Sequence, residues 1–419
     1  MNKNIKHAVA GAVLAMSASA AHAGIVIPAG DWTLDVNGNV NAFGSWSKFD
    51  HAATITGGIA GAKDQAGEDT TQSINTGLLP AWLGFTGKTR QNDLDVEFTM
   101  SLQPNVSSNG STGDGAGNVG PNTLFRQSYV SFGDKSWGSV KLGKDIGIFA
   151  SDAILNDMTL LGVGGAAGNS GTSTTLGGIG TGYIYAAWKG QIAYTTPNMN
   201  GFQATVGITN PNQGLTRNIL TVDGNTGLNG AHLYQDRFGM EGKASYSFAA
   251  EALTGKIWVG GASYKVKGET NSAAASALGT VHEYTADVAD IGVNLNAGNA
   301  GLTAYYYRGD GVGTTILLGN GFSTAHGKRS SDGGYLQGTY VLPTKTKLGV
   351  AYGKSNLDRA AGESASDLVE FNERYTVGLY HPLTKHLNLV AEYNDIESRS
   401  HAGAINKNTT GSLGAILFF

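Results

Sequence analysis

The chain of 419 residues contains no cysteine, only 8 prolines, and charged residues make up just 14 % of it. The absence of cysteine excludes disulfide frameworks, thiolate metal sites and cysteine nucleophiles, and it suits an oxidising compartment. After the first residues, no apolar run reaches the ~18 residues that a membrane-spanning helix needs. The mean hydropathy of −0.13 also argues against a bundle of transmembrane helices.

The first residues have the pattern of a secretory signal peptide. Two lysines open the chain, a short apolar stretch follows at residues 8–20, and "AHA" at residues 21–23 fits a small-x-small cleavage site. We therefore expect a signal peptide over residues 1–23 and a single mature domain over residues 24–419. Its removal takes away two lysines and moves the formal charge from −4 to −6. A nucleic-acid binder should be basic, so no nucleic-acid partner is predicted.

Glycine is abundant, with 63 residues, and the dominant pattern is alternation between apolar and polar positions. "LDVNGNVNAFGSW" near the start sets Val36, Val40 and Trp46 against Asn37 and other polar residues, with Phe43 as the exception. "LDVEFTMSL" and "DRFGMEGKASYSF" repeat this design. Successive strand residues point to opposite faces, so each segment has an apolar face and a polar face.

The number and spacing of these segments predict a large barrel. Short connections such as "GDKSWG" and "LPTKTK" alternate with long polar stretches, which is typical of short periplasmic turns and long extracellular loops. Sixteen strands are expected, at residues 33–47, 74–87, 93–103, 123–133, 138–145, 184–196, 201–209, 236–249, 255–267, 282–296, 301–309, 333–342, 346–354, 369–381, 386–395 and 410–419. The predicted fold is all-β: a 16-stranded antiparallel transmembrane β-barrel with an aqueous channel.

The apolar C-terminal stretch "GSLGAILFF" fits this fold. The last strand must close the barrel on the first, because an unpaired backbone group inside lipid costs several kcal/mol. Leu413, Ala415 and Leu417 are then expected to face lipid, and Phe419 to lie at the periplasmic rim.

Several stretches in order resemble one known family. They are the leader, "LDVNGNVNAFGSW", "LGFTGKT", "LFRQSYVSFGDKSWGSVKLGKD" and the terminal phenylalanine. Together the chain resembles the trimeric general porins of Gram-negative outer membranes. This resemblance implies a homotrimer in contact with outer-membrane lipid and lipopolysaccharide, a loop at residues 103–122 that latches onto a neighbour, and recognition of Phe419 by the barrel-assembly machinery.

The resemblance also implies that the third extracellular loop, residues 145–182, folds inward and narrows the pore. It places Asp152 and Asp157 on this loop. The wall residues expected to face them are Arg126, Lys144, Lys189, Arg374, Trp82 and Asn39. Trp82 stands where the family has an arginine. We therefore expect the loop acids to be largely unpaired and the channel to have a mild cation preference.

General diffusion of small hydrophilic solutes and ions is the favoured function. A substrate-selective channel is the alternative, with Trp82, Tyr305 and Tyr307 as a possible aromatic slide. A second and weaker alternative is a structural surface protein or adhesin that makes contacts through its long loops. Catalysis has little support, because no histidine lies in a His-x-x-x-His pair or a nucleophile elbow. No enzyme activity, metal or cofactor is predicted.

Overall fold

The computed structural model describes residues 24–104, 123–165, 174–210, 231–234, 237–270, 282–323, 327–364 and 366–419. The expected signal peptide lies outside the described residues, as do residues 105–122 of the expected latching loop and residues 166–173 of the third loop.

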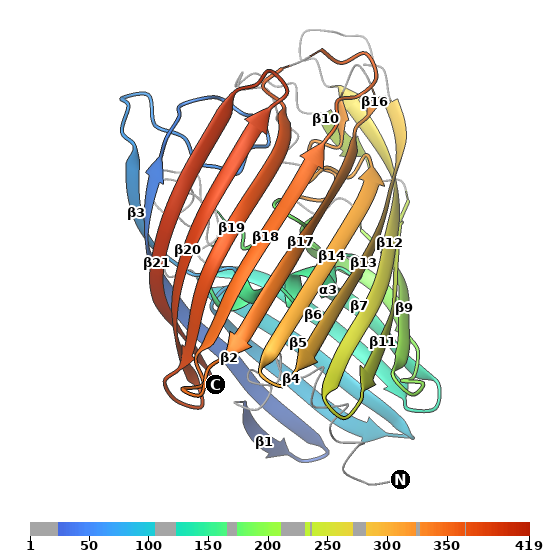
Figure 1. The fold of residues 1–419 in the computed structure, drawn as a ribbon. Coiled ribbons are helices and arrows are strands. Elements are labelled where there is room, and N and C mark those ends of the chain that lie inside the picture. The colour runs from blue at the N-terminus through green and yellow to red at the C-terminus, as the bar shows by residue number, and fades with distance from the viewer. Residues whose placement is uncertain are drawn as a thin grey trace.

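The strands form a closed 16-stranded antiparallel barrel, which confirms the predicted fold class (Figure 1). The barrel closes where β2 (Trp32–Phe49) pairs with β21 (Ile405–Phe418). Two wall positions are each filled by two strands: β3 (Thr70–Asn75) and β4 (Trp82–Gln91) both pair with β2, and β10 (Ala231–Tyr234) and β11 (Gly239–Ala249) both pair with β12 (Leu253–Thr270). The remaining wall strands are β5 (Leu94–Pro104), β6 (Thr123–Asp134), β7 (Gly138–Ile146), β8 (Trp188–Thr195), β9 (Phe202–Thr209), β13 (His282–Ala297), β14 (Ala300–Asp310), β17 (Ser330–Val341), β18 (Lys347–Leu357), β19 (Val369–Pro382) and β20 (Leu387–Ser400). Small strands β15 (Phe322–Ser323) and β16 (Gly327–Lys328) pair with each other.

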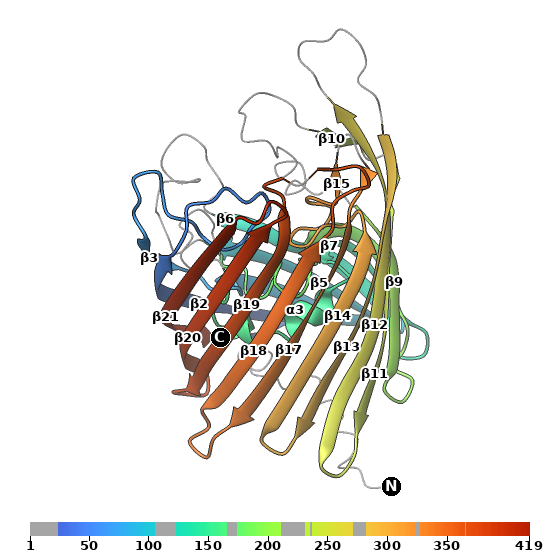
Figure 2. The same ribbon diagram turned by 45° about the horizontal axis from the view of Figure 1, so that its top comes forward.

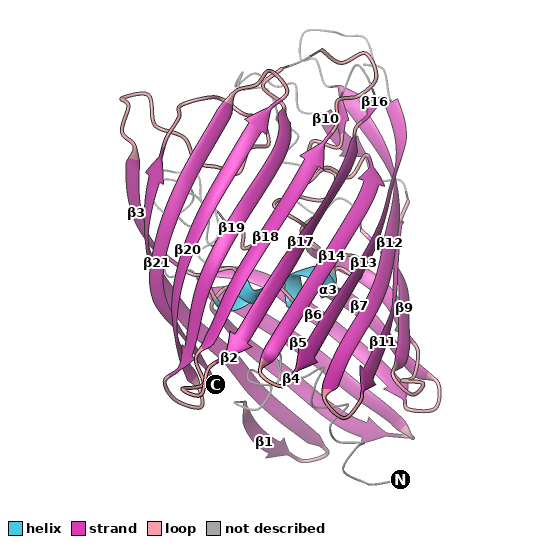
Figure 3. Cartoon of the chain, viewed as in Figure 1, coloured by secondary structure: helices cyan, strands magenta, loops and turns pink. Residues whose placement is uncertain are grey.

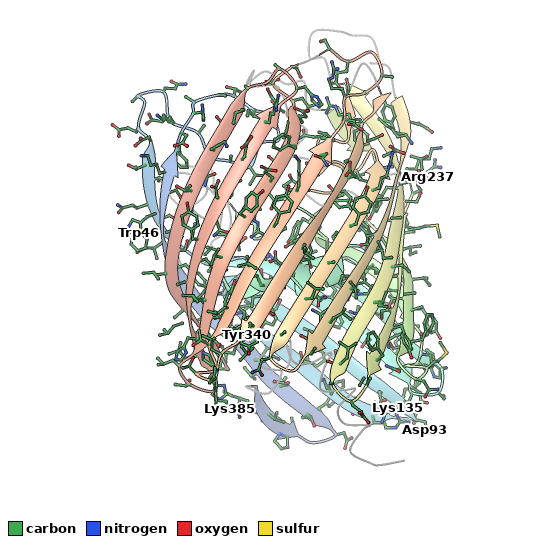
Figure 4. All side chains as sticks on the ribbon, viewed as in Figure 1. Trp46, Asp93, Lys135, Arg237, Tyr340 and Lys385 are labelled. Carbon is green, nitrogen blue, oxygen red and sulfur yellow. The ribbon has the colours of Figure 1, made fainter. Side chains whose placement is uncertain are left out.

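The two faces of the wall differ as the alternation predicts. Val40 and Trp46 of β2 are exposed on the outer face, whereas Asn39, Asn41 and Ser45 are buried on the inner face. Trp46 points away from the barrel, and Asp93, Lys135 and Lys385 lie at the end where the short turns are (Figure 4). Leu413 and Leu417 of β21 are also exposed on the outer face.

One expected strand, residues 74–87, is wrong: the chain forms two strands, β3 and β4, which both pair with β2. Two asparagines of β2 hold the break between them. Asn41 accepts a hydrogen bond from the N–H of Gly77 (2.9 Å) and donates one to the carbonyl of Leu79 (2.9 Å). Asn39 donates to the carbonyl of Pro80 (3.0 Å), a residue that has no N–H to offer a ladder.

A short strand that the alternation did not predict, β1 (Ile25–Ala29), pairs with the first part of β2. It lies at the short-turn end of the barrel (Figure 1). Five residues that include a proline give too weak a strand pattern for prediction.

The described parts of the third loop, residues 147–165 and 174–187, are here called the inner segment and lie within the ring of strands (Figure 2). They contain the only helices of the described residues, α3 (Ser151–Leu155) and the 3-10 helix η1 (Met158–Leu161) (Figure 3). Neither of them is long and apolar enough to cross a membrane.

The inner segment packs against one side of the wall. Phe149 and Tyr183 belong to a buried cluster with inward-facing aromatic residues of β12, β14 and β17, including Trp258 and Tyr335. Met158 packs in a second cluster with Phe43, the apolar exception on the polar face of β2. Phe43 is therefore a contact for the inner segment. The interior is a packed core on this side.

Candidate channel constriction

Glu241 on β11 anchors the start of the inner segment. Its Oε2 accepts hydrogen bonds from the backbone N–H groups of Ile148 (2.7 Å) and Phe149 (2.9 Å). Its Oε1 accepts the hydroxyl of Tyr264 (2.7 Å). The next N–H groups along the chain begin α3, so this anchor fixes where the helix lies in the barrel.

Lys189 neutralises this anchor. Its Nζ lies 2.5 Å from Oε1 of Glu241, and both side chains are almost completely buried. We expected Lys189 to face the pore, but the pairing and burial place it behind the inner segment. A buried carboxylate needs such a cation, because an unpaired buried charge is costly.

Glu392 on β20 anchors the inner segment at a second place, further along the chain. It accepts hydrogen bonds from the N–H groups of Val163 (2.9 Å) and Gly164 (2.8 Å) and from the hydroxyl of Tyr380 (2.7 Å). Between the two glutamates, Gln337 of β17 accepts the N–H of Met158 (2.6 Å). The wall thus holds the backbone of the inner segment at three places.

Asp152 on α3 is paired with two wall lysines. Its Oδ2 lies 3.0 Å from Nζ of Lys243, and its Oδ1 binds Lys256. Burial alone would raise the pKa of Asp152, but these two lysines hold the pKa below its ordinary value. The carboxylate side chain is 6 % exposed, against 27 % for Lys243 and 20 % for Lys256. The charged groups that reach water here are cationic.

Asp157 stabilises the inner segment from within. It accepts the N–H of Thr159 (2.9 Å), the N–H of Gly178 (2.8 Å) and the hydroxyl of Tyr183 (2.8 Å). Burial, and then the nearby Asp157 carboxylate, raise the pKa of Tyr183 well above its ordinary value. Arg374 of β19 lies 3.9 Å from the same carboxylate, and both side chains are only 2 % exposed.

The expectation that Asp152 and Asp157 extend unpaired into the pore is therefore wrong. Asp152 has two lysine partners, and Asp157 has Arg374. Of the acids and cations named from sequence, the structure brings together Asp157 and Arg374. The cations that neutralise Asp152 were not expected at this site.

Arg126 lies at an irregularity of β6. Met100 pairs with Ser128 and Leu102 pairs with Phe125, so the single residue Ser101 lies opposite both Arg126 and Gln127. Such a bulge re-aims side chains. Burial raises the pKa of Tyr185 in the inner segment, and the positive charge of Arg126 opposes this rise. Within the described residues, Arg126 has no hydrogen bond or ion pair.

Lys144 lies on the outer face, so its expected place in the pore is wrong. It pairs with Ser128 and Gly190, and Leu142 on the same face of β7 pairs with the exposed residues Val130 and Ile192. Its Nζ donates a hydrogen bond to the carbonyl of Phe125 (2.9 Å). The neighbouring Asp145 has the opposite orientation and is buried.

Trp82 and Asn39 are opposite each other on the inner face of β4 and β2. The indole N–H of Trp82 donates a long hydrogen bond to Asn37 (3.4 Å). Tyr305 and Tyr307, the other residues of the possible aromatic slide, are buried in the cluster under the inner segment. These two tyrosines therefore have no free face for a passing solute.

Sequence reasoning missed Glu241, Lys243, Lys256 and Glu392 as site residues. All four occur at polar positions of β11, β12 and β20, and a charged residue at such a position was the available signal. Across the described ranges, no three His, Asp or Glu side chains are grouped in a way that could hold a metal ion.

A closed barrel with an apolar outer face, a polar inner face and a segment packed inside it defines a transmembrane channel protein. The family model for Gram-negative porins matches residues 10–401, and the chain belongs to this family. It is an outer-membrane channel for passive diffusion.

Solved structures share the fold at low identity. The outer membrane channel DcaP of Acinetobacter baumannii has a TM-score of 0.66 at 15 % identity, with 95 % of this chain and 100 % of that chain covered. An anion-selective porin from Comamonas acidovorans has a TM-score of 0.58 at 15 % identity, with 93 % of this chain and 100 % of that chain covered. The trimer form of OmpT from Vibrio cholerae has a TM-score of 0.51 at 14 % identity, with 93 % of this chain and 99 % of that chain covered. A search of the curated proteins found no match.

Proposed function

We propose that this porin passes small hydrophilic solutes by passive diffusion with a mild preference for anions. The observation that carries the proposal is the exposure of charge near α3: the acids are buried and the cations beside them reach water. This reverses the cation preference expected from the sequence, because that expectation assumed unpaired acids on the inner segment.

The same difference in exposure between a cation and its acid recurs on β7. Lys141 of β7 pairs with Asp145, and its side chain is 35 % exposed against 7 % for the acid. Lys243 and Lys256 are likewise more exposed than Asp152, the acid with which both are paired. Arg126 adds a cation with no acid beside it in the described part of the chain. A permeating ion therefore approaches the ammonium and guanidinium groups more closely than the carboxylates.

The preference should be small. A unit charge ~8 Å from an ion in water contributes about 0.5 kcal/mol, and salt at 0.1 M screens this to about 0.2 kcal/mol. One charge then favours anions and disfavours cations by a factor of roughly 1.4 each. Removing one pore cation should change the anion-to-cation permeability ratio about twofold.

Arg126→Gln tests the proposal, because it removes a pore cation without leaving an acid unpaired. The reversal potential across a planar bilayer in a potassium chloride gradient should be anion-selective for the wild type and shift toward cations in the variant. Lys135→Gln is the control, since Lys135 lies on an exposed turn at the short-turn end (Figure 4). A cation-selective wild type, or equal shifts in both variants, would contradict the proposal.

Assembly as a homotrimer is part of the same proposal. Lys144 supports it, because a lysine on the lipid face of a barrel is unfavourable, by up to about 2–4 kcal/mol at the bilayer midplane. A neighbouring protomer over this part of β6 to β8 would remove that cost. Light scattering in mild detergent should give the mass of three chains. Because leucine does not carry the cost of a lysine in lipid, a single barrel with Lys144→Leu should be at least as stable as a single wild-type barrel. A wild-type particle with the mass of one chain would refute the trimer.

A further inference from the structure

The connection between β2 and β3 turns into the barrel at the end opposite the short turns, where Figure 2 shows it in blue. Residues 53–61 of this connection, here called the strap, contact the inner faces of β19, β20 and β21. The wall side chains that hold the strap are Asn372, Ser398 and Asn406, one from each strand, and all three are buried. The strap therefore lies inside the wall and not on its rim.

Two asparagines bind the backbone of the strap. Asn406 accepts a hydrogen bond from the N–H of Ala53 (3.0 Å) and donates one to the carbonyl of the same residue (2.8 Å). Asn372 accepts the N–H of Ile59 (3.0 Å) and donates to the carbonyl of Gly57 (3.0 Å). A side-chain amide has both a donor and an acceptor, as a peptide group has, so each asparagine replaces a strand partner that the strap lacks.

The strap also contacts the inner segment. Ile59 and Ala60 form a buried cluster with Ile396 of β20, and Leu176 of the inner segment packs against this cluster. Ser398 accepts the N–H groups of Ile59 and Ala60, both at 2.9 Å. The strap thus lies in contact with the wall on one side and with the inner segment on another.

Side chains provide most of the hydrogen bonds between the strap and the wall. Backbone hydrogen bonds join the two at Thr56, whose N–H donates to Asp367 (2.9 Å) and whose carbonyl accepts from Val369 (2.9 Å). Neutral side-chain hydrogen bonds are individually modest in strength. A few substitutions should therefore release the strap and leave the strand ladder of the barrel intact.

We propose that the strap is a second size filter of this channel, and that Asn372, Ser398 and Asn406 set its position. A chain segment held on the inner face occupies part of the cross-section of the barrel. Large solutes must pass it in addition to the inner segment, whereas small solutes need less of the cross-section. The proposal rests on passive diffusion through the barrel and does not depend on the sign of the ion preference.

The test measures the entry of uncharged sugars into vesicles that contain the purified protein. Asn372→Leu/Asn406→Leu should raise the rate for a trisaccharide about tenfold, because the loss of these hydrogen bonds shifts the strap toward its released position. The rate for a monosaccharide should hardly change. Asn406→Leu alone is the milder variant and should raise the trisaccharide rate about threefold. Asn299→Leu, on an exposed short turn, is the control, and gel mobility before and after heating checks that each barrel is folded.

A reversible cross-link provides a second measurement in one and the same protein. The chain has no cysteine, and Thr56 and Leu368 are partners in a β-bridge, so cysteines at these two positions lie close enough to join. Thr56→Cys/Leu368→Cys is added to the variant that lacks both asparagines. Oxidation should restore the wild-type trisaccharide rate, and reduction should raise the rate again.

Three results would overturn the proposal. The first is a wild-type trisaccharide rate in the reduced protein that lacks both asparagines. The second is an equal rise for the monosaccharide and the trisaccharide, which indicates a wider pore with no separate filter. The third is a trisaccharide rate that is the same after oxidation and after reduction, or a pair of cysteines that does not cross-link.

Discussion

Glu241→Leu should loosen the inner segment and destabilise the barrel, and these two effects can be separated. The substitution removes the acceptor for the N–H groups of Ile148 and Phe149, and it leaves Lys189 buried without its partner. The first change releases the start of the inner segment. The second places an uncompensated charge behind it.

The magnitudes follow from the burial of the pair. Removing one partner of a buried ion pair costs about 3–5 kcal/mol. The two N–H groups add about 1–3 kcal/mol each while they stay buried, but they can bind water once the segment moves away. Glu241→Leu should therefore lower the free energy of unfolding by about 5 kcal/mol. In Lys189→Met/Glu241→Leu the stranded charge is gone, so about 3–5 kcal/mol should return.

The assay combines denaturant unfolding in detergent with single-channel recording. Both variants should show larger and noisier conductance than the wild type, because neither can hold Ile148 and Phe149. Glu251→Leu, the same substitution on an exposed turn, is the control. Wild-type conductance in both variants would refute the anchoring role of Glu241. A double variant no more stable than the single one would refute the argument about the buried charge.

Further predictions concern single positions. The pKa of Asp152 lies below 3.8, so its ion pairs should persist between about pH 5 and 8 and be lost as pH falls through that lower value; the difference in conductance between the wild type and Asp152→Asn should change only below about pH 4. Gly77→Ala puts a Cβ 2.0 Å from the carbonyl oxygen of Gly162 and should cost about 1–3 kcal/mol in denaturant unfolding, whereas Gly411→Ala, with nothing within 4 Å, should cost little. Trp82→Ala should raise single-channel conductance, and no change would place the ring outside the narrow part of the pore.

The fold could be predicted because barrel strands carry a local signal. Alternation assigned the outer and inner faces of β2 correctly, since each residue has only two possible directions. The ends of the strands were harder to predict where the chain leaves the barrel wall for the interior. The expected strand at residues 184–196 starts at Trp188, because Ile184 is buried in the cluster of the inner segment.

The charge pattern of the site could not be predicted in the same way. Asp152 is paired with residues about a hundred positions away, Lys256 among them, and no local pattern reports that contact. Lys144 was expected to face inward, but the alternation of β7 gives it the opposite face to Asp145. A one-residue change in register reverses a side chain, so a single charged residue in a short strand is easily assigned to the wrong face.

The inner segment packs against only one side of the barrel. Interior positions on that side should therefore tolerate mutation less well than interior positions on the other side. Substituting Trp258 or Tyr335 with alanine should cost about 3–5 kcal/mol, as in the core of a soluble protein. The backbone anchors of the inner segment described above come from β11, β17 and β20 and not from β4 to β7, so changes at inward positions of β4 to β7 should alter which solutes pass at little cost in stability. Sequence variation that tunes solute preference in this porin should therefore accumulate on β4 to β7, while the side that holds the inner segment stays constrained.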